Sequence, residues 1–261
     1  MNANALLQQF SEQQVAGFIL VLARVSPLFL VAPMFSSKMV PSRVKGIAAV
    51  GLAVGMAPLA TKGQHVPLDV MGLVALIAKE FLVGLAFAYA LSVLFAAVSA
   101  AGSLADTLIG FSFGALVDPV TGNNASVLSQ AYSLVGVAVF IAINGDAWVI
   151  QGLNHTYELV PLLDYPALGS MVAGVQHAFV GIFVAAVELS APVLLAVIIT
   201  DAAFGVVARV VPQLNVFQVG FPAKVTIGLL VIGVSLPFAA GWISDELQRS
   251  VGAALQSLRV A

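Results

Sequence analysis

The sequence predicts an all-α membrane protein. Three observations lead to this class: 61% of the 261 residues are hydrophobic, only 8% are charged, and the apolar residues form long runs over the whole chain. Soluble domains contain about 45–50% apolar and about 25% charged residues. An ordinary soluble protein is therefore excluded, and lipid or other protein at membrane level is expected to surround the chain.

Charge and cysteine content exclude several function classes. The formal net charge is −2, so bulk electrostatics indicate no nucleic-acid partner. The chain has no cysteine, which excludes disulfides, thiol catalysis and thiolate metal sites. The first residues lack a basic region followed by a small-residue cleavage site, so we expect no removable signal peptide.

Six apolar segments are candidates for membrane spans, each of which needs about 20 mostly apolar residues. They cover residues 15–33, 44–60, 70–105, 131–143, 172–200 and 223–243. The third and fifth exceed one simple span, and the fourth is short unless it begins near residue 127. We therefore expect bent, tilted or partly re-entrant helices.

Charges in the connections favour one orientation in the membrane. Five basic residues fall in the connections 36–45, 106–130 and 201–224, and three fall in the segments on the other side. Connection 144–170 is acidic and has no lysine or arginine. The positive-inside rule places the three basic connections in the cytoplasm and connection 144–170 outside.

Four charged residues interrupt the apolar segments. Arg24 lies in the first segment, Lys79 and Glu80 lie in the third, and Glu188 lies in the fifth. On insertion scales a charge at the bilayer centre costs about 2.5–3.5 kcal/mol, so each is expected to face protein or water.

Two of these charges lie close to a proline. Pro27 has no N–H for the carbonyl of Ala23, and Pro192 has none for the carbonyl of Glu188, so both helices are expected to kink.

Lys79 and Glu80 are sequence neighbours on one predicted helix. Adjacent helical residues point about 100° apart, so these two are predicted not to pair along one helical face. Their partners are expected on other elements or other subunits.

The last residues, 244–261, predict a short amphipathic helix. Leu247, Val251, Leu255 and Leu258 share one helical face, and Ser244 can cap its start. The apolar face fits either a membrane interface or neighbouring subunit, or the bundle of the chain itself.

The pentapeptide at residues 110–114, Gly-Phe-Ser-Phe-Gly, matches the G-x-S-x-G pattern of serine hydrolases. That pattern needs a preceding strand, a following helix, and histidine and aspartate partners. Here an apolar helical run precedes it, and the three histidines lie in unrelated contexts. With no metal-ligand spacing and no phosphate-binding loop either, we expect neither an enzyme nor a cofactor.

The same stretch, residues 108–117, has a second interpretation as an apolar loop. It carries two glycines and runs into Asp118-Pro119 and further turn residues. A non-helical apolar loop at membrane depth must be buried in protein or line a cavity. Phe111 and Phe113 could close a pore by excluding water, or could fill a core between helices.

A second irregular stretch is predicted between Arg209 and Pro222. Gln213, Asn215 and Gln218 lie there among apolar residues, and their amides need hydrogen-bond partners. They fit a polar junction between helices or an ordinary loop at headgroup level.

Several of these segments together resemble the FliR-type flagellar biosynthetic proteins, the family that includes the SctT component of virulence-type secretion systems. The resemblance covers nearly the whole chain, in order. The residues that carry it are Leu22-Ala-Arg-Val-Ser-Pro-Leu-Phe29 with Ala32-Pro33, Val40-Pro-Ser-Arg-Val-Lys45, Lys79-Glu80 before Gly84, residues 110–119, Asn144-Gly145 and residues 209–222.

The resemblance implies a subunit of a protein export gate in the bacterial inner membrane, within the flagellar basal body. Its implied partners are FliP-type and FliQ-type gate subunits, FlhB-type and FlhA-type export proteins, unfolded flagellar substrates and membrane lipid. It also implies bent helical hairpins, with a FliP-like part at residues 1–171 and a FliQ-like hairpin at residues 172–261.

The resemblance assigns roles to individual residues as well. The loop at about residues 106–122 would plug the closed channel, with Ile109, Gly110, Phe111, Ser112, Phe113 and Gly114 as the plug. Subunit interfaces would surround the intramembrane charges, which are Arg24, Lys79, Glu80, Glu188, Arg209 and Lys224.

Two other functions compete with a channel subunit of the export gate. A secondary transporter of a small solute also has broken helices with polar residues near the midplane, and predicts two related halves. An intramembrane hydrolase would use Ser112 as its nucleophile.

Overall fold

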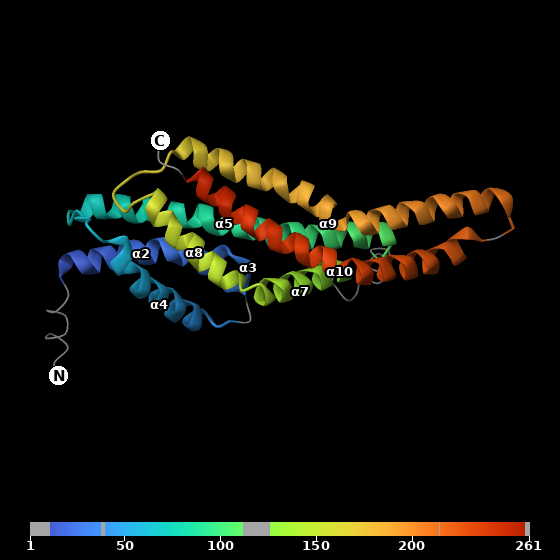
Figure 1. Cartoon of the computed structure of the whole chain (residues 1–261), viewed down its shortest axis with the longest axis horizontal. Helices are drawn as coiled ribbons and strands as arrows, with labels where there is room; N and C mark the ends of the chain where they lie inside the picture. The colour runs from blue at the N-terminus through green and yellow to red at the C-terminus, as the bar shows by residue number, and fades with distance from the viewer. Residues whose placement is uncertain (1–10, 38–39, 112–125, 214, 259–261) are drawn as a thin grey trace. The chain divides into compact units, whose positions relative to one another are not determined.

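The computed structural model describes residues 11–37, 40–111, 126–213 and 215–258. Over these ranges the regular structure is helical and no strand occurs, which confirms the all-α prediction (Figure 1). Five of the described helices are long and apolar enough to cross a membrane, and six spans result if the broken pair of α7 (Val127–Ala142) and α8 (Gly145–Leu159) counts as one.

The chain forms two compact units, each built from separate stretches of sequence. Unit 1 contains residues 1–92, 145–178 and 248–261, and unit 2 contains residues 93–144 and 179–247. Three long helices contribute to both units: α5 (Val70–Ile109), α9 (Leu168–Val210) and α10 (Val216–Ser257). The predicted division at residues 171 and 172 concerns relatedness to other proteins and stays a prediction.

Unit 1 begins with α2 (Glu12–Val31), which packs on α4 (Ser42–Ala60); the short α3 (Pro33–Ser36) lies between them in sequence. Ser11 starts α2 with a capping box. Its hydroxyl accepts from the Gln14 N–H at 3.3 Å, and its own N–H donates to the Gln14 side chain at 3.1 Å. One face of α2 is fully buried and carries Leu20, Val25 and Leu28.

Unit 2 has an apolar core between the second half of α5, α7, α9 and α10. One cluster contains Val98, Ala101, Tyr132, Ala186, Leu189, Ala239 and Ile243. A second contains Ala105, Ile109, Leu128, Val193 and Val197. Alanine and valine occupy many positions of these two clusters. Small side chains let the helices of membrane proteins approach one another closely.

Within unit 2, α9 and α10 form an antiparallel hairpin, in which α9 ends at Val210 and α10 begins at Val216 (Figure 1). Asn215 caps α10, since its side-chain oxygen accepts from the Gln218 N–H at 3.2 Å. The predicted irregular stretch 209–222 was therefore too long. Helix α10 already includes Pro222, because a proline inside a membrane helix is tolerated when neighbouring groups satisfy the freed carbonyl.

The structure decides three further expectations about helices. Helices α5 and α9 are each continuous, so neither long segment has a re-entrant break. The predicted C-terminal helix is the end of α10 and does not start at Ser244. Its apolar face packs on the chain itself, since Leu247, Val251 and Leu258 are buried.

Helix α8 was missed altogether, because the acidic residues of connection 144–170 hid its apolar periodicity. Val149, Leu153 and Tyr157 lie four residues apart, and all three are buried. The helix begins after Asn144, whose φ of 53° ends α7. Helix α8 supplies the side chains that complete the buried cluster described below.

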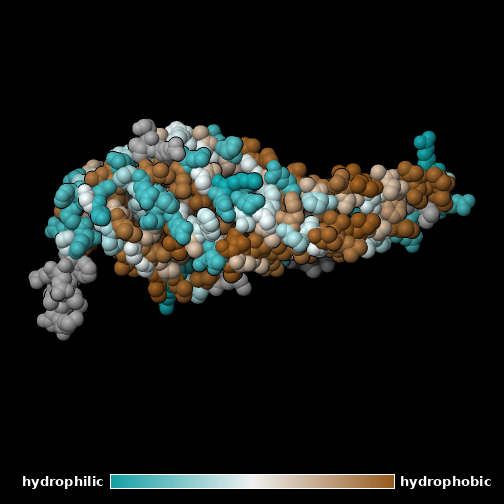
Figure 2. Space-filling view, in the orientation of Figure 1, coloured by the Kyte–Doolittle hydropathy of each residue, from teal (hydrophilic) through white to brown (hydrophobic). Residues whose placement is uncertain are grey.

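Much of the hairpin surface in unit 2 is apolar. Figure 2 shows this surface over the parts of α9 and α10 nearest their connecting turn. Val206 is 65% exposed and Val234 is 82% exposed. Such a surface requires lipid or another protein against it.

Candidate functional site

The most unusual feature of unit 1 is a group of three charged side chains inside it. Arg24 and Glu80 have no exposed surface, and Lys79 is 6% exposed. Helical spacing puts Arg24 on the buried face of α2, four residues from Leu20 and from Leu28. Glu80 likewise follows buried Leu76 by four residues on α5. The apolar faces of the two helices thus carry the charges into the interior.

Arg24 and Glu80 form a two-pronged ion pair between α2 and α5. The Arg24 Nε contacts Glu80 Oε2, and Arg24 Nη2 donates to Glu80 Oε1 at 2.9 Å. The remaining Arg24 donors reach Thr156 Oγ1 at 3.2 Å and the carbonyl of Val160 at 2.8 Å. The ring of Tyr157 lies 4.1 Å from the guanidinium carbon. An arginine–carboxylate ion pair with two parallel hydrogen bonds is among the strongest side-chain interactions in proteins.

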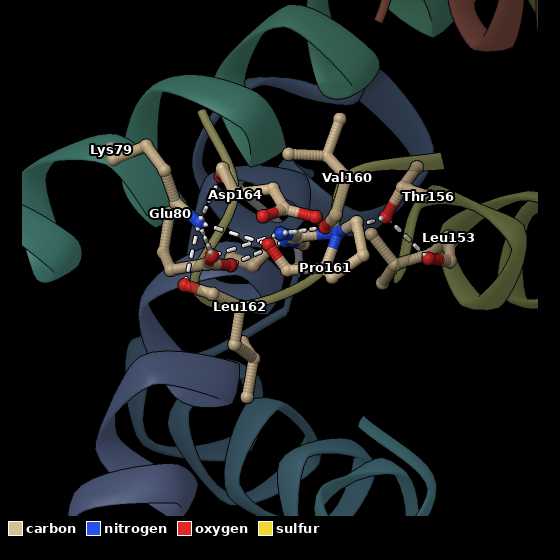
Figure 3. Close-up of polar contacts among 9 residues, drawn as sticks. Lys79, Glu80, Leu153, Thr156, Val160, Pro161, Leu162 and Asp164 are labelled. Carbon is tan, nitrogen blue, oxygen red and sulfur yellow. Dashed lines mark hydrogen bonds and ion pairs between the residues drawn. The ribbon is translucent and has the colours of Figure 1, made fainter. Parts of the chain in front are cut away.

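Lys79 is surrounded by backbone carbonyls from the turn that follows α8. Its Nζ donates to the carbonyls of Leu162 at 2.8 Å, Asp164 at 3.0 Å and Pro161 at 3.2 Å. It also lies 2.6 Å from Glu80 Oε1. Figure 3 shows these groups converging on the ammonium.

The prediction that Lys79 and Glu80 do not pair with each other is wrong. Adjacent positions do point apart, but the flexible lysine stem reaches around the helix and both side chains turn toward residues 160–164. The expectation of partners on other elements is correct, and those partners lie in the same chain. Arg24, Lys79 and Glu80 thus need no second subunit to be satisfied.

A close contact between backbones makes this cluster possible. Gly84, one turn after Glu80, lies directly against the carbonyl of Arg24, and a Cβ there would overlap that group. The small residue lets α2 and α5 approach closely enough for the Arg24 fork to meet Glu80.

The cluster contains two cations and one carboxylate, and carbonyl dipoles offset the extra positive charge. In the described part of the chain no group of three histidine or acidic side chains could hold a metal. The cluster joins α2, α5, α8 and the turn 160–164 in one hydrogen-bonded network. Its chemistry is structural, since the Arg24 guanidinium, the Lys79 ammonium and the Thr156 hydroxyl all have partners in this chain. We call Arg24, Lys79 and Glu80 with these partners the buried lock.

The other predicted intramembrane charges lie in unit 2. Lys224 on α10 pairs with Asp201 on α9, with Nζ 2.7 Å from Oδ1, so its partner also belongs to this chain. Arg209 is exposed at the end of α9. Glu188 is exposed and accepts a hydrogen bond from Trp242 Nε1 at 3.2 Å.

The predicted polar junction is exposed in this structure. Gln213 and Asn215 lie between α9 and α10, and Gln218 lies in the first turn of α10. Asn215 serves as the cap of α10, while the side chains of Gln213 and Gln218 face outward.

The predicted plug falls partly inside the described residues. Gly110 ends α5 with a φ of 101°, and the N–H groups of Gly110 and Phe111 both donate to the carbonyl of Asp106, at 3.0 and 3.1 Å. Ile109 is fully buried against Gly228, and Phe111 packs on the second core cluster. Ser112, Phe113 and Gly114 lie outside the described residues.

Sequence reasoning missed Asp106, which lies beside this loop. Asp106 is buried near the end of α5, and its Oδ1 accepts from the N–H of Leu128, in the first turn of α7, at 3.2 Å. An acidic side chain in the last turn of an apolar helix opposes the helix dipole, so it signals a donor elsewhere. Asp106 therefore binds both ends of the chain segment between α5 and α7.

Replacing Asp106 with alanine is expected to lower the free energy of unfolding by about 1–3 kcal/mol, because the buried Leu128 N–H loses its acceptor. Asparagine at the same position keeps an oxygen and should retain most of the stability. Thermal unfolding of the purified protein measures both. Equal behaviour of the alanine and asparagine variants would remove the proposed role of this acceptor.

Comparison with known proteins identifies the family. Residues 15–250 match the pattern of the bacterial export proteins, family 1. The chain belongs to this family.

Relatives of known name agree with this membership over most of their length. The chain is 29% identical to the flagellar biosynthetic protein FliR of Escherichia coli (strain K12), covering 90% of this chain and 91% of the relative. It is 30% identical to FliR of Bacillus subtilis (strain 168), covering 84% and 86%. It is 25% identical to the surface presentation of antigens protein SpaR of Shigella sonnei, covering 81% and 82%.

Membership makes this chain a bacterial export protein whose matched region contains every described residue of the buried lock. The same region contains Asp106 and the hairpin turn of unit 2. The relatives are named for flagellar biosynthesis and for surface presentation of antigens, and none of those names denotes an enzyme.

Proposed function

We propose that this protein is a channel-forming subunit of a flagellar type III protein export gate in the bacterial inner membrane, at the flagellar basal body. The observation that carries the proposal is the match to the bacterial export family over residues 15–250, with FliR relatives covered almost end to end. Three FliR relatives at 27–30% identity support a flagellar system.

The structure supports an assembled subunit in two ways. Its apolar hairpin surface in unit 2 needs a protein or lipid neighbour, and its buried lock is paired within the chain, which leaves the hairpin surface and not the lock for neighbours. We propose FliP-type and FliQ-type subunits as the neighbours, FlhB-type and FlhA-type proteins as further components, and unfolded flagellar proteins as the cargo.

We assign the closing of the channel to residues 109–114. Ile109 and Gly110 anchor the start of this segment in unit 2, since Ile109 is buried and Gly110 ends α5. The aromatic side chains at 111 and 113 supply the apolar bulk that excludes water from a narrow pore.

Deleting residues 110–114 is expected to make the assembled complex conduct ions, because the apolar stopper is lost. The measurement is ionic current across a planar bilayer, after copurification has shown that the complex still forms. A milder variant, with alanine at both Phe111 and Phe113, tests the same assignment if the deletion prevents folding. A matched control, with alanine at both Phe81 and Trp148, two exposed aromatic residues on α5 and α8 in unit 1, should leave the current unchanged.

An unchanged current from an assembled complex with the deletion would overturn the plug assignment. A purified monomer that binds a small solute and recruits no other subunit would instead favour the secondary transporter.

A further inference from the structure

One carboxylate lies on an otherwise apolar exposed face of α9 in unit 2. Val180, Val184, Glu188, Ala191 and Leu195 follow one another at helical spacings of three and four, so they share a face, and all five are exposed. The opposite face is packed into the core of unit 2 through residues such as Ala185, Leu189 and Val193.

Glu188 is held in place without being neutralised. Trp242 on α10 packs against the first core cluster and donates its indole N–H to Glu188 Oε2 at 3.2 Å. Among the residues that the structure describes, no cation lies within ion-pair distance of this carboxylate. The neutral indole N–H of Trp242 therefore orients the Glu188 carboxylate but does not balance its charge. A cation that balances this charge must come from outside the described residues.

The backbone at this position adds a second acceptor. Pro192 lies four residues after Glu188 and has no N–H to donate to the Glu188 carbonyl. Glu188 thus presents a carboxylate and a carbonyl that lacks its usual helical donor. Lysine offers three donors and arginine offers five, so either cation can satisfy both acceptors.

Lipid is a poor neighbour for this face. Hydrocarbon fits the valines and leucine of the stripe but not an ionised carboxylate, which in membrane proteins pairs with another polar group. A single polar residue within an apolar helical stripe is also how packed helices fix their register. Both arguments select a helix with one complementary charge.

We propose that Glu188, oriented by Trp242, is the docking point for an apolar helix of another polypeptide that carries a lysine or arginine at the matching position. The proposal rests on the proposed function, because the export complex supplies the partner polypeptide. The apolar stripe on either side of Glu188 supplies the contact area, and the ion pair sets the register.

The first test measures how much partner protein copurifies with a tagged chain from cells that make the whole export complex. Glu188→Gln keeps an oxygen for Trp242 and removes only the charge, so we expect at least about a tenfold loss of copurified partner. Glu158→Gln is the matched control: this glutamate is exposed on α8 and pairs with His155. The control should copurify the partner at the wild-type level.

The second test identifies the occupant. A photo-crosslinking residue at Ala191, one turn from Glu188, is expected to form an adduct with a helix of a different protein that contains a lysine or arginine. Exchange of the charges, with Glu188→Lys and a glutamate at the partner's cation, should restore copurification that either change alone removes.

The possible outcomes separate this inference from the function on which it rests. Undiminished copurification with Glu188→Gln, in a complex that the wild-type chain does form, would overturn the inference alone. Adducts only with lipid or with a second copy of this chain would also overturn it. Failure of the wild-type chain to copurify any export subunit would instead contradict the proposed function.

Discussion

Replacement of Glu80 by glutamine is expected to lower the free energy of unfolding by about 3–5 kcal/mol, because Arg24 and Lys79 then stay buried without a counter-charge. Solvent water does not replace the lost carboxylate, since Arg24 and Glu80 have no exposed surface. Thermal unfolding of the purified protein in detergent measures the loss. The level of the protein in membranes is expected to fall with it, because unfolded chains are degraded.

Glu158→Gln is the control for this experiment as well, since it neutralises an acidic residue that is exposed on α8. It should change the stability by less than about 0.5 kcal/mol. A Glu80→Gln variant as stable as this control would show that the buried lock contributes nothing. A triple variant with apolar residues at positions 24, 79 and 80 should recover only part of the loss, because the carbonyls of residues 160–164 lose their donors.

Gly84→Ala is expected to cost about 3 kcal/mol or more, because the added methyl group would overlap the backbone carbonyl of Arg24. Neither helix can relieve this overlap by a side-chain rotation, so α2 and α5 must move apart. That movement also pulls the Arg24 fork away from Glu80. The expected signature is a loss of stability together with faster proteolysis of unit 1.

Gly46→Ala provides the matched control, because a Cβ at Gly46 on α4 meets nothing within 4 Å. Alanine is the better helix former by about 1 kcal/mol, so this variant should be as stable as wild type or more so. A loss of stability for Gly84→Ala together with an unchanged or higher stability for Gly46→Ala would confirm that the close contact at Gly84 determines the effect. A Gly84→Ala variant with wild-type stability would contradict the contact between α2 and α5.

The sequence predicts the helices better than the contacts between them. Apolar runs identified α2, α4, α5, α7, α9 and α10, because burial in lipid or protein leaves a strong compositional signal. Helix α8 escaped because only one of its faces is apolar, and its acidic residues resembled a loop. Ser244 looked like a cap, yet the preceding helix continues through it because tertiary packing outweighs local preference.

The charges show where such reasoning stops. Arg24 and Glu80 were recognised as residues that need partners, but 56 positions separate them and no local pattern links the two. The pairing of Lys79 with Glu80 was rejected on helical geometry alone, which ignored the reach of the lysine stem. Asp106 is not predicted as a site residue, although an acidic side chain at the end of an apolar helix indicates a buried donor nearby. The roles of residues 109–114 remain predictions.

The lengths of α5, α9 and α10 have a practical consequence. At about 1.5 Å per residue, helices of 40 to 43 residues have a contour of roughly 60 Å, twice the thickness of bilayer hydrocarbon. The hydrocarbon of one bilayer therefore cannot cover the whole apolar length of these helices. If the proposed export subunits cover the remaining apolar surface, a chain made without them should be degraded, and its abundance in the cell should follow theirs.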